Sequence, residues 1–258
     1  MNKIIIDNEE VIKSDIDYSY NKKENVFDIS ELMLNINDSK DLSLYIKTKE
    51  DSRLVISFNI MDNTNLNVYI ITEGKKSKIQ YKYNLGKKAT CKVEKLNIVD
   101  GIREMVITNL KESSNFKYVF KSITVNSENY DYMIYHDGEN STSNIINNCI
   151  NESGSIYLQI SSFIPEKIKG CSTNQYNRII NNTNNKCEIK PNLYIDCDDV
   201  NANHSALIDK FNNNELFYLQ SRGIDKKTSI KILSKGFLLS NISNKQIIDL
   251  INKRYGGE

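Results

Sequence analysis

The sequence contains no tryptophan, only two prolines and only two histidines among its 258 residues. No apolar run approaches the roughly 20 residues that a membrane-spanning helix needs. The five cysteines form no CxxC pair, so neither the spacing of a zinc site nor that of a self-contained iron-sulfur motif occurs. We therefore predict no membrane span and no resident metal centre of these common types.

The sequence also has no marked excess of positive or negative charge. Lys and Arg number 34 against 33 Asp and Glu, a net charge of +1, so no overall field attracts nucleic acid or an anionic membrane. The apolar start at Ile4, Ile5 and Ile6 is interrupted by Asp7 and is too short for a signal peptide. The odd number of cysteines is typical of free thiols. We expect a protein of the reducing cytoplasm that binds neither nucleic acid nor membrane.

Short alternating apolar runs fill the chain from about Leu42, and each is followed by a polar turn. Examples are Leu54 to Ile60 and Phe116 to Phe120, with turns such as Asp100-Gly101 between the runs. A repeat of roughly ten to twelve residues fits an antiparallel sandwich or a stacked solenoid. The length of the repeating region and the scarcity of tight hairpin signals favour the solenoid. We predict a mainly β protein built around a parallel β-helix.

The period changes near residue 210, where three short helices are predicted. The first ends at Gly223; the second is capped by Asp225 and stopped by Gly236; the third is capped by Ser243. The predicted organisation is a short N-terminal segment (1–40), a β-helix (41–209) and a small helical cap (210–258). Three short helices bury little among themselves, so they need the end of the β-helix or a partner protein.

Few residues are candidates for chemistry. His204 could bind metal or move protons near neutral pH, although an isolated histidine is more often a structural one. Asp196 and Asp198 could act as a carboxylate pair, or could belong to a solvated turn. Cys187 and Cys197 lie ten residues apart, which we take as one coil length, so their thiols could stack near His204. No phosphate loop, HExxH motif or nucleophile elbow is present, so we do not expect ATP hydrolysis by this chain alone.

Two segments carry a specific family pattern. Residues 190–206 read KPNLYIDCDDVNANHSA, and residues 215–224 read ELFYLQSRGI, with Gly236-Phe237 downstream. In order, spacing and residue types they resemble the C-terminal core of the SufB/SufD family, whose pattern is approximately KPxLxIxxDDVxxxHxA, a variable loop, LFYLxSRGI and a later GF. Residues 174–180 (NQYNRII) are similar to the preceding family segment.

This resemblance implies a right-handed parallel β-helix of the SufBD type with a C-terminal helical domain. It also implies a subunit of the Suf iron-sulfur cluster assembly complex, which would dimerise through its β-helix with a SufB-like subunit or a second copy of itself. A SufC-like ABC ATPase would dock on the C-terminal helices. The docking candidates are Leu216, Phe217, Tyr218, Ser221, Arg222, Gly223, Ile224, Gly236 and Phe237.

The resemblance matches His204 to a family histidine that helps bind iron or the nascent cluster, and we add Cys187 and Cys197 as weaker metal candidates. Tyr176 stands where SufB-type members have their key cysteine, and Ala202 where many SufD-type members have one. These departures favour a SufD-like, non-enzymatic scaffold that shares a transient cluster with its partner and holds none stably alone. The alternatives are a Suf-like interaction platform without cluster binding, or a carbohydrate-active β-helix enzyme that uses Asp196 and Asp198.

Overall fold

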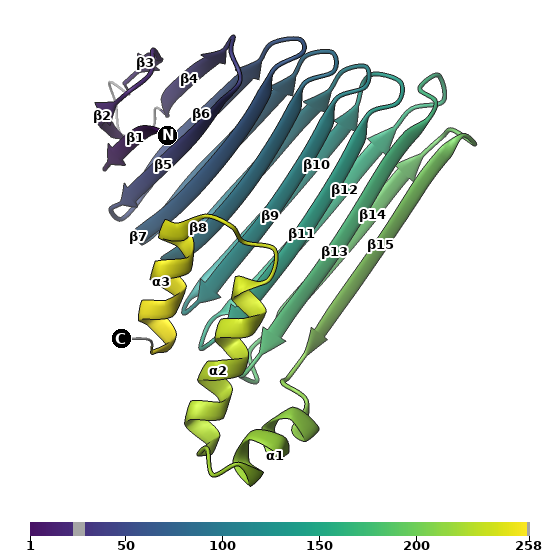
Figure 1. The fold of residues 1–258 in the computed structure, drawn as a ribbon. Coiled ribbons are helices and arrows are strands. Elements are labelled where there is room, and N and C mark those ends of the chain that lie inside the picture. The colour runs from purple at the N-terminus through teal and green to yellow at the C-terminus, as the bar shows by residue number, and fades with distance from the viewer. Residues whose placement is uncertain (23–28, 257–258) are drawn as a thin grey trace.

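The computed structural model describes residues 1–22 and 29–256. These residues form a parallel β-helix of about seven coils, with three helices packed along one side (Figure 1). Neighbouring coils pair in parallel and in register over nearly their whole length, which confirms the predicted β-helix and rules out the antiparallel sandwich. Residues 23–28, which belong to the predicted N-terminal segment 1–40, lie outside the described residues, as do the last two residues.

Each coil contributes a strand to two facing layers. The first layer holds β1 (Asn2–Asp7), β5 (Lys40–Thr48), β9 (Asn115–Thr124), β11 (Thr142–Asn151), β13 (Cys171–Asn181) and β15 (Val200–Asp209). The second layer holds β4 (Ser30–Ile36), β6 (Ser52–Ile60), β10 (Ser127–His136), β12 (Ser155–Ile164) and β14 (Cys187–Ile195). β7 (Asn65–Leu85) and β8 (Thr90–Leu110) are long enough to pass through both.

The long strands turn from one layer to the other at two glycines. Gly74 has a φ of +128° in β7, and Gly101 has a φ of +89° in β8. Residues with a side chain rarely adopt such backbone angles. The Asp100-Gly101 pair, which the sequence suggested as a turn between two runs, is therefore a corner inside one continuous strand.

The N-terminal end of the β-helix is covered by two short antiparallel strands. β2 (Glu10–Ser14) pairs with β1, and β3 (Ser19–Asn21) pairs with β4. On their other sides β1 and β4 pair in parallel with β5 and β6. The coils thus begin before residue 41, inside the segment that the sequence separated from the β-helix.

The interior is largely apolar and aromatic, and a buried ionic cluster lies in its middle coils. The ammonium of Lys95 contacts the carboxylate of Glu104, and both side chains are fully buried. Asn97 bridges the two: Lys95 donates to its Oδ1 at 2.8 Å, and its Nδ2 donates to Glu104 Oε2 at 3.0 Å. Burial lowers the pKa of Lys95, and the contact with Glu104 opposes that effect.

The helices are α1 (Asn213–Ser221), α2 (Lys226–Leu239) and α3 (Lys245–Tyr255). Asp225 caps α2 as predicted, and Gly223 follows α1 with a φ of +83°. Two predictions were wrong: Gly236 lies inside α2, where helical geometry continues to Leu239, and α3 is capped by Asn244 rather than Ser243. No helix among the described residues is long and apolar enough to cross a membrane.

The helices are held on the first layer by an apolar cluster and by polar contacts. Leu238, Ile247 and Ile251 are buried against outward-facing strand residues such as Leu96 and Ile123. At the start of α3, the backbone N–H groups of Ser243 and Asn244 each donate to Glu94 at 2.9 Å. A carboxylate at a helix N-terminus also complements the helix dipole.

Candidate functional site

The C-terminal end of the β-helix is open. β15 pairs only with β13, and β14 pairs only with β12, so each strand has one edge without a neighbouring strand among the described residues. Nearly all of β15 is exposed, whereas the equivalent strands of inner coils alternate between buried and half-buried residues. An unpaired strand edge is a ready template for pairing with another chain.

His204 lies in the middle of this open end. The register of the coils places it in line with Gln175 of β13, Ile145 of β11 and Tyr118 of β9. Because aligned residues of parallel strands face the same way, His204 continues a row that is buried from Leu42 of β5 to Gln175 of β13. The histidine is exposed because no coil follows.

The interior just beneath His204 is polar rather than apolar. Gln175 is fully buried, and its Nε2 donates to Ser162 Oγ at 2.9 Å and to the Asn192 carbonyl oxygen at 3.2 Å. Its Oε1 makes no hydrogen bond within the described part of the chain. Asn177 donates to the Ser205 carbonyl oxygen at 3.0 Å. The open end therefore presents a histidine above buried amide groups.

An outward-facing aromatic stack also reaches the open end. The Tyr135 and Phe163 rings lie 4.7 Å apart, and Phe163 and Tyr194 lie 4.8 Å apart. Tyr194, on β14, is 53% exposed and has no aromatic neighbour on the following side. Sequence reasoning missed this residue. Its outward place in the Leu193-Tyr194-Ile195 run is the signal that would have identified it.

The structure separates the other predicted metal ligands. Cys187 begins β14 and Cys197 follows its end, so the two thiols lie at opposite ends of one strand and do not stack as expected. Burial raises the pKa of the Cys187 thiol, which favours the protonated form. Cys197 packs instead with Cys171 and Ile164. Among residues 1–22 and 29–256, no group of three or more His, Cys, Asp or Glu could hold a metal ion.

The aspartates lie in the exposed turn between β14 and β15. Asp196 and Asp198 precede β15 and follow the last residue of β14, and both are exposed. The Asp196 backbone N–H donates to the Ile164 carbonyl oxygen at 3.0 Å, which closes the coil. This position is that of a solvated turn, so it gives no support to a glycoside-cleaving carboxylate pair.

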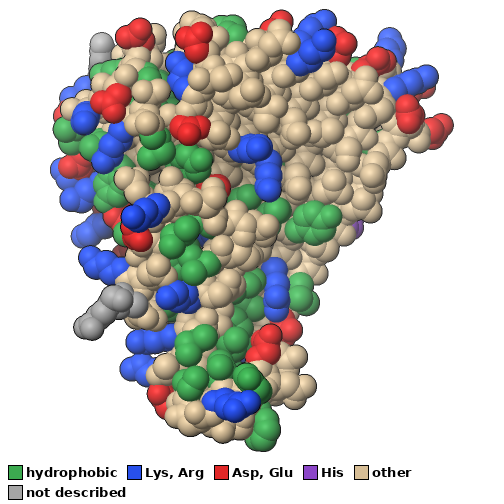
Figure 2. Space-filling view, in the orientation of Figure 1, with side chains coloured by type: hydrophobic (Ala, Val, Ile, Leu, Met, Phe, Trp, Pro, Cys, Tyr) green, Lys and Arg blue, Asp and Glu red, His purple; other side chains and the backbone are tan. Residues whose placement is uncertain are grey.

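α1 presents the most exposed aromatic residues of the described chain. Phe217 is 73% exposed and Tyr218 is 58% exposed, and α1 contains no buried residue. Arg222 lies over the Tyr218 ring at 5.4 Å, and Ser221 Oγ donates to the Tyr218 carbonyl oxygen at 2.7 Å. Figure 2 shows apolar side chains gathered over the helices at the lower end of the molecule. Exposed apolar patches of this kind mark interaction surfaces.

Three of the docking candidates do not share this exposure. Leu216 and Phe237 are partly buried in the apolar cluster beneath the helices, and the Arg178 guanidinium lies 5.4 Å from the Phe237 ring. Ile224 is half-buried at the α1–α2 junction, where its N–H donates to the Leu219 carbonyl oxygen at 3.2 Å. Leu216 and Phe237 therefore help to hold the helices to the β-helix.

A groove of about 960 Å³ runs between α2 and the strands β13 and β15. Its lining includes Gly236 on the helix side and Tyr176, which is 48% exposed, on the strand side. Tyr176 pairs in register with Ser205, the residue after His204, but it lies on the outward face. Ala202 lies on the inward row, two residues before His204. Tyr176 and Ala202, the two positions that the resemblance singled out, thus lie on opposite faces of the layer at the last coils.

Three known relatives match parts of the chain. Protein ABCI7, chloroplastic, of Arabidopsis thaliana is 41% identical over 24% of this chain and 14% of its own length. The iron-sulfur cluster assembly protein SufD of Bacillus subtilis is 26% identical over 50% of this chain and 31% of its own. An iron-sulfur cluster assembly SufBD family protein of Mycobacterium leprae is 35% identical over 30% of this chain and 21% of its own. The matches therefore span less than a third of each relative.

The match to a protein family is much longer. Residues 20–237 match the family described as SUF system FeS cluster assembly, SufBD core domain. The matched range begins near β3 and ends within α2, so it includes nearly all of the β-helix, its open end and the first two helices. Together with the parallel β-helix and the motifs of residues 174–237, this match shows that the chain belongs to the SufBD core family.

Proposed function

We propose that this chain is a non-enzymatic, SufD-like scaffold subunit of a Suf-type iron-sulfur cluster assembly complex. The observation that carries the proposal is the open coil end with His204 at its centre, in a chain of the SufBD core family. The iron-sulfur cluster is the cargo of the complex and is not a resident group of this chain. In this proposal the chain supplies a pairing surface, a docking surface and one candidate ligand.

The pairing surface is the open end. β14 and β15 offer two strand edges, and Tyr194 offers a ring face that continues an existing stack. A second β-helix that abuts this end would satisfy the free backbone groups and cover the apolar edge. The partner is a SufB-like subunit or a second copy of this chain.

The docking surface is α1. Phe217 and Tyr218 contribute little to the packing of the chain itself, because α1 buries none of its residues. Aromatic residues that become buried on binding are the usual energetic centres of protein interfaces. We assign this face to a SufC-like ABC ATPase.

Phe217→Asp is expected to weaken binding of the ATPase about tenfold to thirtyfold without lowering the stability of the free chain. The substitution removes an exposed aromatic anchor and would place an unpaired charge in the interface. Isothermal titration calorimetry of the full chain with the ATPase measures the change.

The matched control is Tyr18→Asp, which makes the same kind of change at a residue that is 41% exposed near the covered end. This variant should bind the ATPase as the unaltered chain does. Equal binding by the Phe217→Asp variant would contradict the docking assignment, and so would equal weakening by both variants.

His204 is proposed as one ligand of iron or of the nascent cluster at the paired interface. Its imidazole is a common ligand of iron, and its exposed place on the inward row would become enclosed when a partner covers the end. The remaining ligands are assigned to the partner subunit.

His204→Ala is expected to lower the iron and sulfide content of the anaerobically reconstituted complex by at least half. Iron and sulfide analysis measures the loss, and analytical ultracentrifugation of the same sample shows whether the subunits remain paired. Ser205→Ala, at the next residue on the outward face, is the control and should change neither quantity.

Full iron and sulfide content in the His204→Ala complex would contradict the ligand role and favour an interaction platform without cluster binding. A monomer that pairs neither with itself nor with a SufB-like subunit would contradict the pairing surface. The docking measurement is independent of both results.

A further inference from the structure

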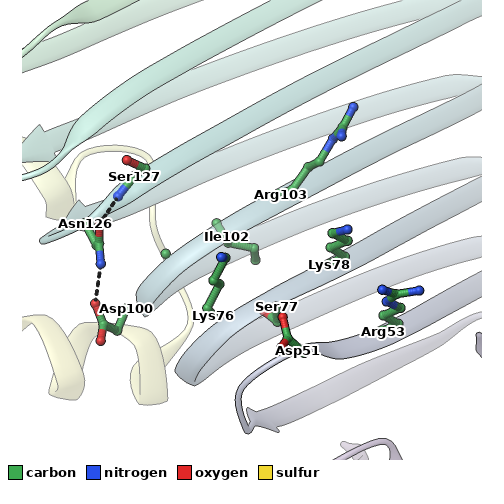
Figure 3. A pocket seen from close by; sticks show the side chains of 11 residues that line it. Asp51, Arg53, Lys76, Ser77, Lys78, Asp100, Ile102, Arg103, Asn126 and Ser127 are labelled. Carbon is green, nitrogen blue, oxygen red and sulfur yellow. Dashed lines mark hydrogen bonds between the residues drawn. The ribbon is translucent and has the colours of Figure 1, made fainter. Parts of the chain in front are cut away.

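Three cations form an in-register row on the face of the β-helix opposite the helices. Arg53 of β6 pairs with Lys78 of β7, and Lys78 pairs with Arg103 of β8. Figure 3 shows these side chains in a row across three neighbouring strands. Neighbouring strands are about 4.8 Å apart, so three positive charges follow one another at about that spacing. Lys76 adds a fourth cation at the same site.

Such a row is unfavourable for the fold itself, because like charges directly opposite each other destabilise a strand pair. Another aligned outward row of the same coils is filled by groups that satisfy one another. Asn109 donates to Asn84 at 2.8 Å, Asn84 to Asn59 at 2.9 Å, and Asn59 to Asn35 at 2.9 Å. The cation row differs from this asparagine row because like charges cannot satisfy one another.

Nearby acids do not neutralise the row. None of the four cations takes part in an ion pair within residues 1–22 and 29–256. Glu9 accepts the backbone N–H of Arg53, and Asp100 Oδ1 accepts from Asn126 Nδ2 at 3.1 Å. Asp51 also lines the pocket. Burial raises the pKa of Asp131, and the Arg103 guanidinium opposes that rise.

The cations line a pocket rather than a flat surface. Its volume is about 380 Å³, within the range of small-molecule sites. Ser77, Asn126 and Ser127 add polar groups to its wall, and the buried Ile102 forms its apolar part. A pocket with clustered cations, polar donors and an apolar wall fits a phosphorylated small molecule.

The distance between the cations of the row indicates which kind of phosphate group fits the pocket. Arg53 and Arg103 are two strand intervals apart, about 10 Å between their backbones. A single phosphate contacts two neighbouring cations of such a row, whereas a diphosphate is long enough to contact all three. We propose that this pocket binds the diphosphate group of a small molecule through Arg53, Lys78 and Arg103. This site is separate from the open coil end and from α1, so it goes beyond the proposed function.

The test is titration calorimetry of the full chain with inorganic pyrophosphate and, separately, with inorganic phosphate at low ionic strength. Pyrophosphate is expected to bind at least tenfold more tightly than phosphate. Lys78→Gln removes the central charge and is expected to weaken pyrophosphate binding at least tenfold. The same variant should unfold at a slightly higher temperature without ligand, because repulsion between the flanking arginines and Lys78 is relieved.

The matched control is Lys82→Gln, which removes the same charge from the same strand four residues later. Lys82 lies outside the row and has its own partner, Glu31, at 4.0 Å. Its loss should leave pyrophosphate binding within about twofold. Absence of pyrophosphate binding, equal binding of phosphate, or equal weakening by Lys78→Gln and Lys82→Gln would each overturn the proposal. None of these results bears on ATPase docking or on His204.

Discussion

Replacing Lys95 with methionine is expected to lower the free energy of unfolding by about 3–5 kcal/mol, the cost of breaking a buried ion pair from one side. Glu104 would keep its place in the interior with Asn97, Tyr118 and Tyr132 as its remaining partners. These neutral groups donate hydrogen bonds but bring no opposite charge. The Lys95 ammonium also lies 4.8 Å from the Tyr81 ring centre, so a cation–π contact would be lost as well.

The matched experiment removes both charges. In the Lys95→Met, Glu104→Gln double variant neither member of the pair leaves a charged partner behind, so at least half of the lost stability should return. Lys82→Met, at a half-buried site on the outward face, should change stability by no more than about 0.5 kcal/mol. Urea unfolding followed by circular dichroism measures all three variants. Equal losses in the single and double variants would show that the pair is not what stabilises this part of the interior.

Gly154→Ala is expected to lower the free energy of unfolding by about 3 kcal/mol. A Cβ atom at this position would lie 1.9 Å from the Asn126 carbonyl oxygen and 2.7 Å from the Asn126 nitrogen. Both are backbone atoms of the preceding coil, so no side chain can swing away to make room. The coils would have to separate locally, which disturbs the register on both sides of the turn.

Gly236→Ala is the matched control, because it makes the same chemical change with the opposite expected sign. Apart from the neighbouring residues and backbone of its own helix, no heavy atom lies within 4 Å of the position that its Cβ would occupy, and the residue is inside α2. Alanine favours a helix interior by about 0.5–1 kcal/mol over glycine, so thermal unfolding should move upward. A fall in stability would contradict the placement of Gly236 within the helix.

The sequence was sufficient to predict the strands, the helices and several of the helix ends. Alternation of apolar residues identified the strands, Asp225 marked the start of α2, and Gly223 marked the end of α1. The prediction that Gly236 ends α2 was wrong because a glycine is tolerated inside a helix that tertiary packing stabilises. Here the buried Leu238 contributes to that packing. Asn244 and Ser243 are both good caps, so only geometry could choose between them.

What the sequence did not reveal is which residues meet from coil to coil. A spacing of ten residues was taken as one coil, which suggested that Cys187 and Cys197 would stack. Each coil holds two strands and their turns, so the true interval is 25 residues at Arg53, Lys78 and Arg103 and 29 residues from Gln175 to His204. With that interval the cation row could have been found from the sequence. The meeting of Lys95 and Glu104 could not, because it depends on the corner at Gly101.

The difference between the two ends of the β-helix limits how far such molecules can polymerise. A stack of parallel strands open at both ends could add copies indefinitely and grow into a fibre. Here β2 and β3 cover one end with short antiparallel strands, whereas β14 and β15 leave the last coil of the described chain open to parallel pairing. Two copies that met at their open ends would present only covered ends to further copies. Growth would therefore stop at a pair, without a separate capping protein.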